Sequence, residues 1–394
     1  MGSVNITLAN GQLGGTLQTS DGIAGLIMTG VTEPGYAVGT PVLLTNAADA
    51  DAAGISNIHN RFARRQIKEY YDQAGPGAWL YVMLVAPTMT MADMADNSNA
   101  DGVRKLLDFA GGKIRIVGLL SDDDAIEDAG TPTVVSNGLN AQVYVAATKM
   151  AVTAAAYFER HKPFRAIIGG SSCSAEAAEL ADMTTGTTNN RTAILVGDTQ
   201  VSRAACVGLV LGIAAALPVQ RKISRVRSGA LTNVEAYVGD QQVGALGDDM
   251  AVIAQKGFMT FTTYANTSGF YMAGDPMCAA TTGDYCMLAR GRVIDKAHIL
   301  AYTTFVQVVD DEVPVNTDGT LDAGFCKWLS QQITNLVNNT MTANREISSI
   351  RCYIDPNQNI LSTNRLQVVL SIIPVGYATD IRIELGFSNP ANAN

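Results

Sequence analysis

The chain has 394 residues and a mass of 41.5 kDa, enough for a large hydrophobic core divided between two domains. Only 16% of its residues are charged, compared with roughly 25% in an average globular protein, so we expect neighbouring molecules to cover much of its surface. The net charge of −9 argues against nucleic acid as the main partner.

The chain begins with a short alternating pattern. Val4, Ile6 and Leu8 would share one face of an extended strand, and the glycine-rich residues 10–15 separate this strand from the rest. A lone strand leaves its backbone groups unpaired and one apolar face exposed. We therefore expect residues 1–21 to form an arm whose strand pairs with the sheet of a neighbouring subunit.

Between residues 22 and 256, short apolar runs alternate with stretches of helical periodicity. This pattern predicts an α/β domain with a mostly parallel sheet that is covered on both faces. Strands are expected at residues 23–28, 79–85, 114–120, 165–168 and 193–196, and helices at residues 55–73, 101–109, 139–160, 175–183 and 202–217.

Residues 257–376 follow a different pattern, which predicts an α+β assembly domain in which helices and strands are segregated along the chain. The expected elements are a hairpin formed by residues 258–264 and 270–272, helices at 294–309 and 323–341, and a strand at 347–354.

The last two predicted strands show strict alternation. On the first strand, Leu366, Val368, Leu370 and Ile372 would share one face, which we assign to the sheet that accepts a neighbour's strand. After a turn, residues 377–394 would form a C-terminal arm that is donated to a neighbour. Its apolar row consists of Ile381, Ile383, Leu385 and Phe387, while Asp380, Arg382, Glu384 and Ser388 face away.

A glycine- and serine-rich turn at residues 169–174 is the strongest candidate for chemistry. Its backbone amides could hold a phosphate, or one of its side chains could act as a nucleophile. It matches neither the G-x-S-x-G pattern nor the phosphate-binding loop, and Ser174 as the N-cap of a helix beginning at Ala175 explains it more simply. An α/β enzyme that binds a phosphate- or acyl-containing ligand at this turn is the alternative function.

Histidine and cysteine spacing indicates neither a metal site nor a catalytic group. His59 and His298 fall in expected helices, His161 precedes Pro163, and the six cysteines are scattered without a C-x-x-C pair. We expect reduced thiols, no cofactor and no enzymatic activity. The apolar run at residues 204–217 is too short to span a bilayer, and no secretion signal is recognisable, so we expect cytoplasmic synthesis without membrane insertion.

Two surfaces are expected to contact partners. The densest basic segment carries no aromatic residue, which favours salt bridges between subunits over a nucleic-acid groove; its charged residues are Arg221, Lys222, Arg225 and Arg227. The helix at 323–341 has an apolar side of Phe325, Leu329, Ile333 and Leu336. Its opposite side could face a partner, or the helix could be an ordinary amphipathic one; the polar residues proposed for this contact are Lys327, Gln331, Gln332, Asn335 and Asn338.

In chain order, several stretches resemble contractile tail sheath proteins of phages and phage-tail-like injection systems. They are residues 22–44 with their strand, Gly-Pro turn and Pro-Val-Leu run, residues 202–226, residues 257–274 with 285–292, and residues 366–387. The usual Gly-x-Arg-Thr after the hairpin is here Gly274-Asp275-Pro276-Met277, which indicates a divergent member.

The resemblance implies a structural subunit that polymerises by strand donation into a helical sleeve around an inner tube and contracts to drive the tube through an envelope. The implied partners are other copies of the chain, an inner tail tube protein at the amide-rich helix, and baseplate and terminator proteins at the ends of the sleeve. The implied location is a virion tail or an injection particle. A capsid, baseplate or tube component is a further alternative, which arms at both ends and two domains fit less well.

Overall fold

The computed structural model describes residues 20–186 and 189–387. Contacts divide the chain into one unit that ends at Glu312 and a second that begins at Val313. This division lies later than the boundary expected after residue 256. The reason is that the chain beyond residue 256 packs on the first unit: the Met259 amide donates to the Ile194 carbonyl over 2.9 Å and so continues the pairing at the edge of the central sheet.

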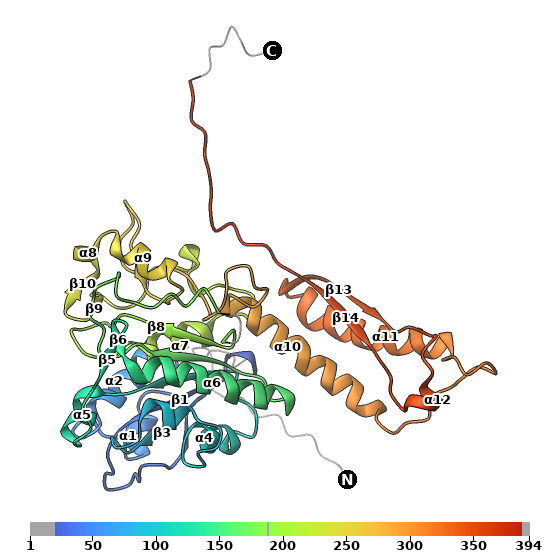
Figure 1. The fold of residues 1–394 in the computed structure, drawn as a ribbon, viewed down its shortest axis with the longest axis horizontal. Coiled ribbons are helices and arrows are strands. Elements are labelled where there is room, and N and C mark those ends of the chain that lie inside the picture. Colours follow the sequence, from blue (N-terminus) through green and yellow to red (C-terminus); the bar gives the residue numbers. More distant parts are fainter. Residues whose placement is uncertain (1–19, 187–188, 388–394) are drawn as a thin grey trace, which may run out of the picture. The chain divides into compact units, whose positions relative to one another are not determined.

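A six-stranded, mostly parallel sheet forms the centre of the first unit, as the sequence predicted (Figure 1). Only the edge strand β2 runs antiparallel to its neighbour. The parallel strands are buried on both faces, which explains why they are continuous apolar runs in the sequence. In spatial order the strands are β2 (Val42–Leu44), β3 (Leu80–Val85), β1 (Ala24–Thr29), β4 (Ile116–Leu120), β7 (Arg165–Gly169) and β8 (Thr192–Leu195).

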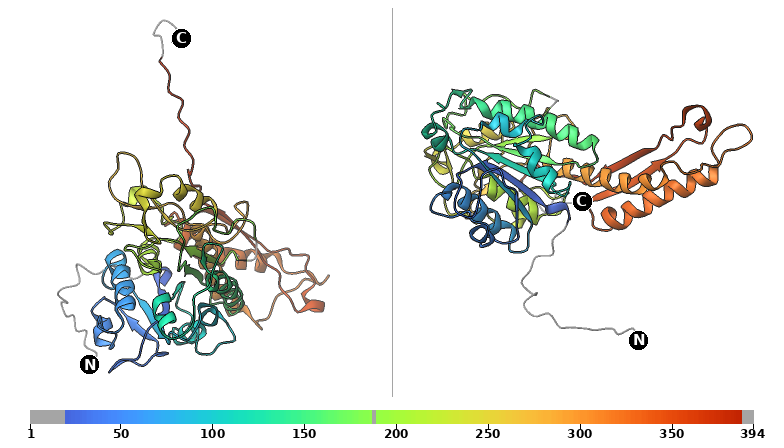
Figure 2. Two further views of the ribbon diagram at one scale, coloured as in Figure 1. Left: turned by 60° about the vertical axis from the view of Figure 1, so that its left-hand side comes forward. Right: turned by 90° about the horizontal axis from the view of Figure 1, so that it is seen from below.

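Helices cover both faces of this sheet (Figure 2). The crossover from β1 to β3 runs in one direction across the sheet and the crossover from β3 to β4 in the other, so right-handed connections place their helices on opposite faces. One face carries α2 (Arg61–Ala74) and α7 (Val207–Ala216), and the other carries α3 (Met91–Ala95), α4 (Val103–Phe109) and α6 (Ala141–Glu159).

Helices α2 and α7 pack unusually closely because two glycines of α7 face the α2 backbone. A Cβ atom at Gly208 would lie 2.0 Å from the carbonyl oxygen of Gln66, and one at Gly212 would lie 2.3 Å from that of Tyr70. The Gln66 side chain reinforces the contact, since its Oε1 accepts from the Gly208 amide over 2.7 Å. A larger residue at either glycine would push the two helices apart.

The predicted hairpin is confirmed as β11 and β12. The remaining elements of the first unit, including this hairpin, surround the sheet. They are η2 (Ser20–Gly22), α1 (Asp49–Ala52), α5 (Asp123–Asp128), β5 (Val135–Ser136), β6 (Leu139–Asn140), η3 (Val226–Ser228), β9 (Tyr237–Val238), β10 (Gln241–Gln242), α8 (Val243–Leu246), α9 (Asp249–Gln255), β11 (Phe261–Thr262), β12 (Tyr271–Met272), α10 (Leu288–Phe305) and η4 (Val306–Val308).

Four predicted helices need correction. The helix predicted at residues 202–217 begins only at Val207, and the one predicted at 294–309 spans Leu288–Phe305. The other two differ as follows. The first begins at Arg61 rather than residue 55, so His59 lies in an exposed turn. The helix predicted at residues 175–183 is absent: Ala175 has a left-handed φ of 61°, and residues 177–179 form a turn. The ammonium of Lys256 donates to the carbonyl oxygens of residues 177, 178 and 180, over 2.8, 2.9 and 2.6 Å, and so replaces the hydrogen bonds of a helix.

The second unit is a helix packed on a two-stranded antiparallel sheet. Helix α11 (Ala323–Val337) ends in a π-helical turn, η5 (Asn338–Thr342), and contacts β13 (Ile347–Tyr353). Strand β13 pairs with β14 (Val369–Pro374), so that Ile350 lies opposite Ile372, and the short α12 (Ile360–Thr363) lies between them in the sequence. This arrangement is the expected α+β type.

All six cysteines lie in the described ranges and are free thiols. In those ranges, no helix combines the length and apolar character that a bilayer span requires.

Candidate functional site

The C-terminal segment exposes a row of large apolar side chains. Beyond β14 the chain is extended, and residues 378–387 form no ladder with any described residue (Figure 1). Ile381, Ile383 and Leu385 are 73%, 74% and 91% exposed, and Phe387 is fully exposed. On the other side of the backbone, Arg382 and Asp380 form an exposed ion pair of 3.0 Å. The alternation is therefore that of a strand, but the segment has no strand partner in its own chain within the described ranges.

The sheet of the second unit has free edges. Within residues 313–387, β13 and β14 pair only with each other, so each has one edge without a ladder. Along and just before β14, the predicted alternation is present: one set of side chains is half-buried, while Val369 and Ile373 are exposed. The half-buried set is Leu366, Val368, Leu370 and Ile372. A sheet edge without a ladder presents unpaired backbone groups to which a further strand can add.

The N-terminal strand residues Val4, Ile6 and Leu8 lie outside the described residues.

The amide-rich side of α11 is exposed over most of its length. Asn338 is half-buried in the π-helical turn, where its side-chain oxygen accepts from the Thr342 hydroxyl over 2.9 Å. The buried positions are Cys326, Leu329, Ile333 and Val337, so the predicted apolar side was wrong at Phe325 and Leu336, which are half-buried at its margins. The exposed polar residues are Lys327, Gln331, Gln332 and Asn335.

Sequence reasoning overlooked Trp328, which lies on the exposed side of α11. Its side chain is 51% exposed, and its ring centroid is 5.9 Å from that of Phe325. The sequence could have indicated this exposure, because Gln331 and Gln332 follow Trp328 by three and four residues, and residues at these spacings share a helix face.

The basic segment at residues 221–227 is divided between the surface and the interior. Lys222 points inward and pairs with the buried Asp275 over 3.2 Å, so it is an internal ion pair and not the subunit contact that was expected. Burial raises the pKa of Asp275, and the nearby ammonium of Lys222 partly offsets this. Arg221 and Arg225 are half-buried and Arg227 is exposed, so these three keep the expected role as a proposal.

The turn at residues 169–174 is occupied by a closed hydrogen-bond network. The Ser172 hydroxyl donates to the buried Asp123 over 2.6 Å, and Asp123 also accepts from Ser121 and Asn140 over 2.8 and 3.0 Å. Burial raises the pKa of the Cys173 thiol, which disfavours a thiolate nucleophile. Ser174 caps no helix, because none follows it. These contacts position the turn structurally and favour no ligand.

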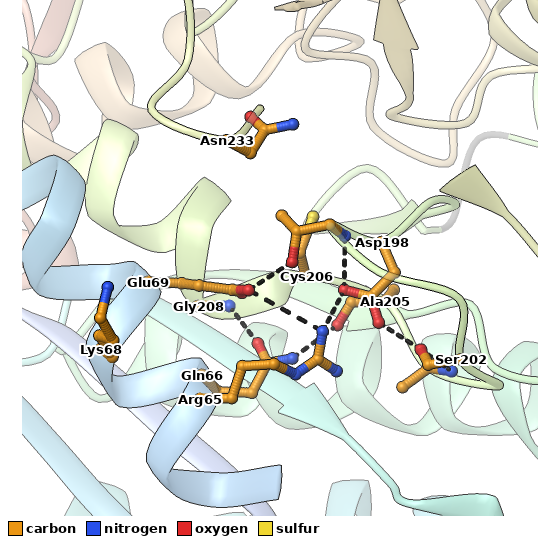
Figure 3. Close-up of polar contacts among 12 residues, drawn as sticks. Arg65, Gln66, Lys68, Glu69, Asp198, Ser202, Ala205, Cys206, Gly208 and Asn233 are labelled. Atoms are coloured by element: carbon orange, nitrogen blue, oxygen red, sulfur yellow. Dashed lines mark hydrogen bonds and ion pairs between the residues drawn. The ribbon is translucent and has the colours of Figure 1, made fainter. Parts of the chain in front are cut away.

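A second polar network joins α2 to the loop between β8 and α7 (Figure 3). Arg65 donates to Asp198 over 2.6 Å and lies 3.8 Å from Glu69, whose carboxylate accepts from the Thr199 hydroxyl over 2.5 Å. The Ser202 hydroxyl donates to Asp198. Arg65 therefore interacts with the carboxylates of both Asp198 and Glu69. Burial raises the pKa of Glu69 to about 7, although the charge of Arg65 acts to lower it.

An open cleft of about 970 Å³ is lined in part by residues of this network, including Arg65 and Ser202. Both signs of charge line it, including Arg61, Arg64 and Lys68 of α2 together with Asp51 and Asp124. No group of three or more histidine, cysteine or acidic side chains in the described ranges could hold a metal ion. The cleft is therefore lined by a mixed-charge surface.

We expect the substitution Glu69→Gln to stabilise the protein above neutral pH. The folded-state pKa of Glu69, about 7, exceeds its ordinary value of 4.5, so ionisation lowers the unfolding free energy as pH rises from 4.5 to 7. The variant should lack this slope and be more stable by roughly 2 to 3 kcal/mol at pH 8. Urea unfolding followed by circular dichroism at pH 5 and pH 8 would measure it, with the exposed Glu179→Gln as control. Equal pH slopes in the wild type and the Glu69 variant would contradict the expectation.

Two family models together match almost the whole chain. A model described as the DUF2586 N-terminal domain matches residues 1–275, and one described as the DUF2586 C-terminal domain matches residues 284–392. No curated protein matches the sequence.

Several solved structures share the fold at low sequence identity. One chain from the baseplate of the anti-feeding prophage is 12% identical with a TM-score of 0.63, and the alignment covers 99% of both chains. A chain from the contracted helical sheath of the same particle is 12% identical with a TM-score of 0.59 and 98% coverage of both chains. A chain from the contracted sheath complex of the extracellular contractile injection system PVC is 11% identical with a TM-score of 0.61, covering 100% of this chain and 99% of that one. The chain therefore has the fold found in these contractile assemblies.

Proposed function

The chain belongs to the DUF2586 family, and we propose that it is the sheath subunit of a contractile tail or injection particle. In this role it polymerises into a helical sleeve around an inner tube, and contraction of the sleeve drives the tube through a target envelope. The proposal draws support from the fold that the chain shares, over nearly its whole length, with chains of contracted sheath assemblies.

The observation that carries the proposal is the pairing deficit in the second unit. Its C-terminal segment presents Ile381, Ile383 and Leu385 without a strand partner among the described residues, and its two-stranded sheet offers free edges. Both deficits are removed if the segment adds to the sheet of another copy. Each backbone hydrogen bond formed would contribute roughly 0.5 to 1.5 kcal/mol net, and each large apolar side chain buried roughly 1.5 to 3 kcal/mol.

Residues 377–394 are then the C-terminal arm, and residues 1–21, with Val4, Ile6 and Leu8, are the matching N-terminal arm. The sheet of the second unit, with Leu370 and Ile372 on its inner face, is the acceptor. Arms of this kind would keep subunits linked while their bodies rotate and repack during contraction. Arg221, Arg225 and Arg227 would contribute salt bridges between neighbouring bodies.

The amide-rich side of α11 is the proposed contact with an inner tail tube protein. Amide side chains both donate and accept hydrogen bonds, so they suit a polar surface that must release its partner when the sleeve contracts. Baseplate and terminator proteins would occupy the ends of the sleeve, and one similar solved chain belongs to a baseplate. The chain would be made in the bacterial cytoplasm and built into the virion tail or injection particle.

Negative-stain electron microscopy of the purified full-length protein would test the proposal. We expect hollow, transversely striated cylinders, either spontaneously or after addition of a tube protein. Discrete compact oligomers under all of these conditions would contradict a sleeve subunit.

A further inference from the structure

Helix α10 is buried in its first half and half-buried or exposed in its second half. Residues Leu288, Arg292, Asp295 and Ala297 are buried in the first unit. After Ala297 no residue of the helix is buried, and Tyr302 is exposed. The contacts made by residues 298–302 therefore decide whether the second half of α10 is held against the first unit.

Those contacts centre on two of the three histidines. The Nδ1 atom of His161 lies 3.1 Å from the Nε2 atom of His298, and the His161 ring stacks on Tyr302 with a centroid distance of 3.8 Å and an interplanar angle of 15°. His298 also packs against Phe158, with ring centroids 4.2 Å apart. His161 follows the end of α6 with a left-handed φ of 59°, a conformation that costs energy for a residue other than glycine. The stack with Tyr302 and the contact with His298 offset that cost.

The contact between the two ring nitrogens requires that one nitrogen donates and the other accepts. Two neutral rings, or one neutral and one charged ring, can satisfy this requirement. When both rings are protonated, every ring nitrogen is a donor and two positive charges lie side by side. The hydrogen bond is then lost and replaced by repulsion.

Charged groups around the pair offer little compensation for a second proton. The nearest acid, Asp295, is already bound by Arg165 over 2.7 Å and by Arg191 over 3.2 Å, and the Arg191 guanidinium lies 4.2 Å from the Phe158 ring centroid. Burial lowers the pKa of His298, and His161 lowers it further, while Asp295 acts in the opposite direction. The other charged groups at this end of α6 are the exposed Glu159 and Arg160 and the half-buried Lys162.

We propose that the His161–His298 pair is an acid-released latch that holds the second half of α10 against α6 at neutral pH and frees it when both rings are protonated. Asp295 and its two arginines keep the first half of the helix anchored throughout. Release is therefore local: residues 298–305 become mobile while the sheet and the buried part of α10 stay folded. The latch depends on contacts within the first unit, so it can be tested independently of the proposed function.

Hydrogen–deuterium exchange of the full-length protein, corrected for intrinsic exchange rates, would test the latch. Between pH 7.5 and pH 4.5 we expect the protection of amides 298–305 to fall about tenfold, because the hydrogen bond between the rings is lost and replaced by repulsion. Amides in α7 should keep their protection. The variant His59→Gln, at the exposed third histidine, should behave as wild type.

Two further variants distinguish release from general destabilisation. His161→Phe keeps a ring to stack on Tyr302 but removes the titrating nitrogen, so its α10 amides should be protected equally at both pH values. His161→Gln combined with His298→Gln should also lose the pH dependence, at a lower protection. The proposal is overturned if wild-type protection is the same at both pH values, or if the His161→Phe variant retains the tenfold fall.

Discussion

Deleting the residues after Ala378 is expected to abolish assembly into cylinders and to leave a folded, soluble protein. In residues 379–387, the described part of the deleted segment, no ladder is formed with other described residues and the side chains are exposed, so the isolated fold loses little packing when they are removed. The assembled form loses a whole donated strand at every joint. Electron microscopy and sedimentation velocity would measure assembly, and circular dichroism would show that the fold and melting temperature are retained.

A point variant makes the same test without shortening the chain. In Ile383→Asp combined with Leu385→Asp, two apolar side chains that should be buried at the joint become charged. Losing their burial removes roughly 3 to 6 kcal/mol, and since each 1.4 kcal/mol is a factor of ten, the assembly constant should fall at least about a hundredfold.

The matched control changes the opposite face of the same strand. Arg382→Ser combined with Glu384→Ser alters two exposed residues that alternate with the apolar row and should assemble nearly as the wild type does. Cylinders of normal appearance from both the deletion and the aspartate variant would contradict strand donation by this arm.

The second large effect is expected from Asp295→Asn in the first unit. Asp295 is buried and binds the buried Arg165 through two hydrogen bonds of 2.7 and 3.1 Å, with Arg191 at 3.2 Å. Removing the carboxylate charge leaves two guanidinium groups close together without a counter-ion in a poorly solvated place. The unfolding free energy should fall by roughly 3 to 5 kcal/mol, the usual cost of breaking a buried ion pair from one side.

Urea unfolding at pH 7 would measure this loss, with the exposed Asp311→Asn as a control that should change stability by less than about 0.5 kcal/mol. A fall below about 1 kcal/mol for the Asp295 variant would mean that water or another group already compensates the two arginines.

The central sheet could be predicted from the sequence because each buried parallel strand is a continuous apolar run. All five strands predicted for the first domain are present with ends shifted by one or two residues. Helix α6 was also predicted closely, although Leu139, taken as its first residue, belongs to β6 instead.

The sequence-based predictions were wrong where a side chain from a distant part of the chain overrides the structure that the local sequence favours. The sequence after Ala175 has helical composition, but Lys256 binds its carbonyl groups from far along the chain and stabilises turns instead. In the same way, Lys222 looks like part of a surface cluster until its partner, the buried Asp275, is known. Single-sequence patterns carry no information about such pairings.

Alternation indicated the apolar face of the C-terminal arm because it depends only on the geometry of an extended chain. The π-helical turn after α11 could not be anticipated in this way. Within α11 the buried positions keep helical spacing through Ile333 and Val337, which leaves Leu336 at the margin. Trp328 was missed for a related reason, since its exposure depends on the exact phase of that helix.

A cryo-electron microscopy map of the assembled protein, with the chain traced through residues 376–387, would test the central claim most directly. The account predicts that residues 381–387 form a strand in ladder contact with the β13–β14 sheet of another copy, with Ile383 and Leu385 turned into its apolar layer. A map in which each C-terminal segment pairs with the sheet of its own copy, or stays unpaired within the assembly, would contradict it.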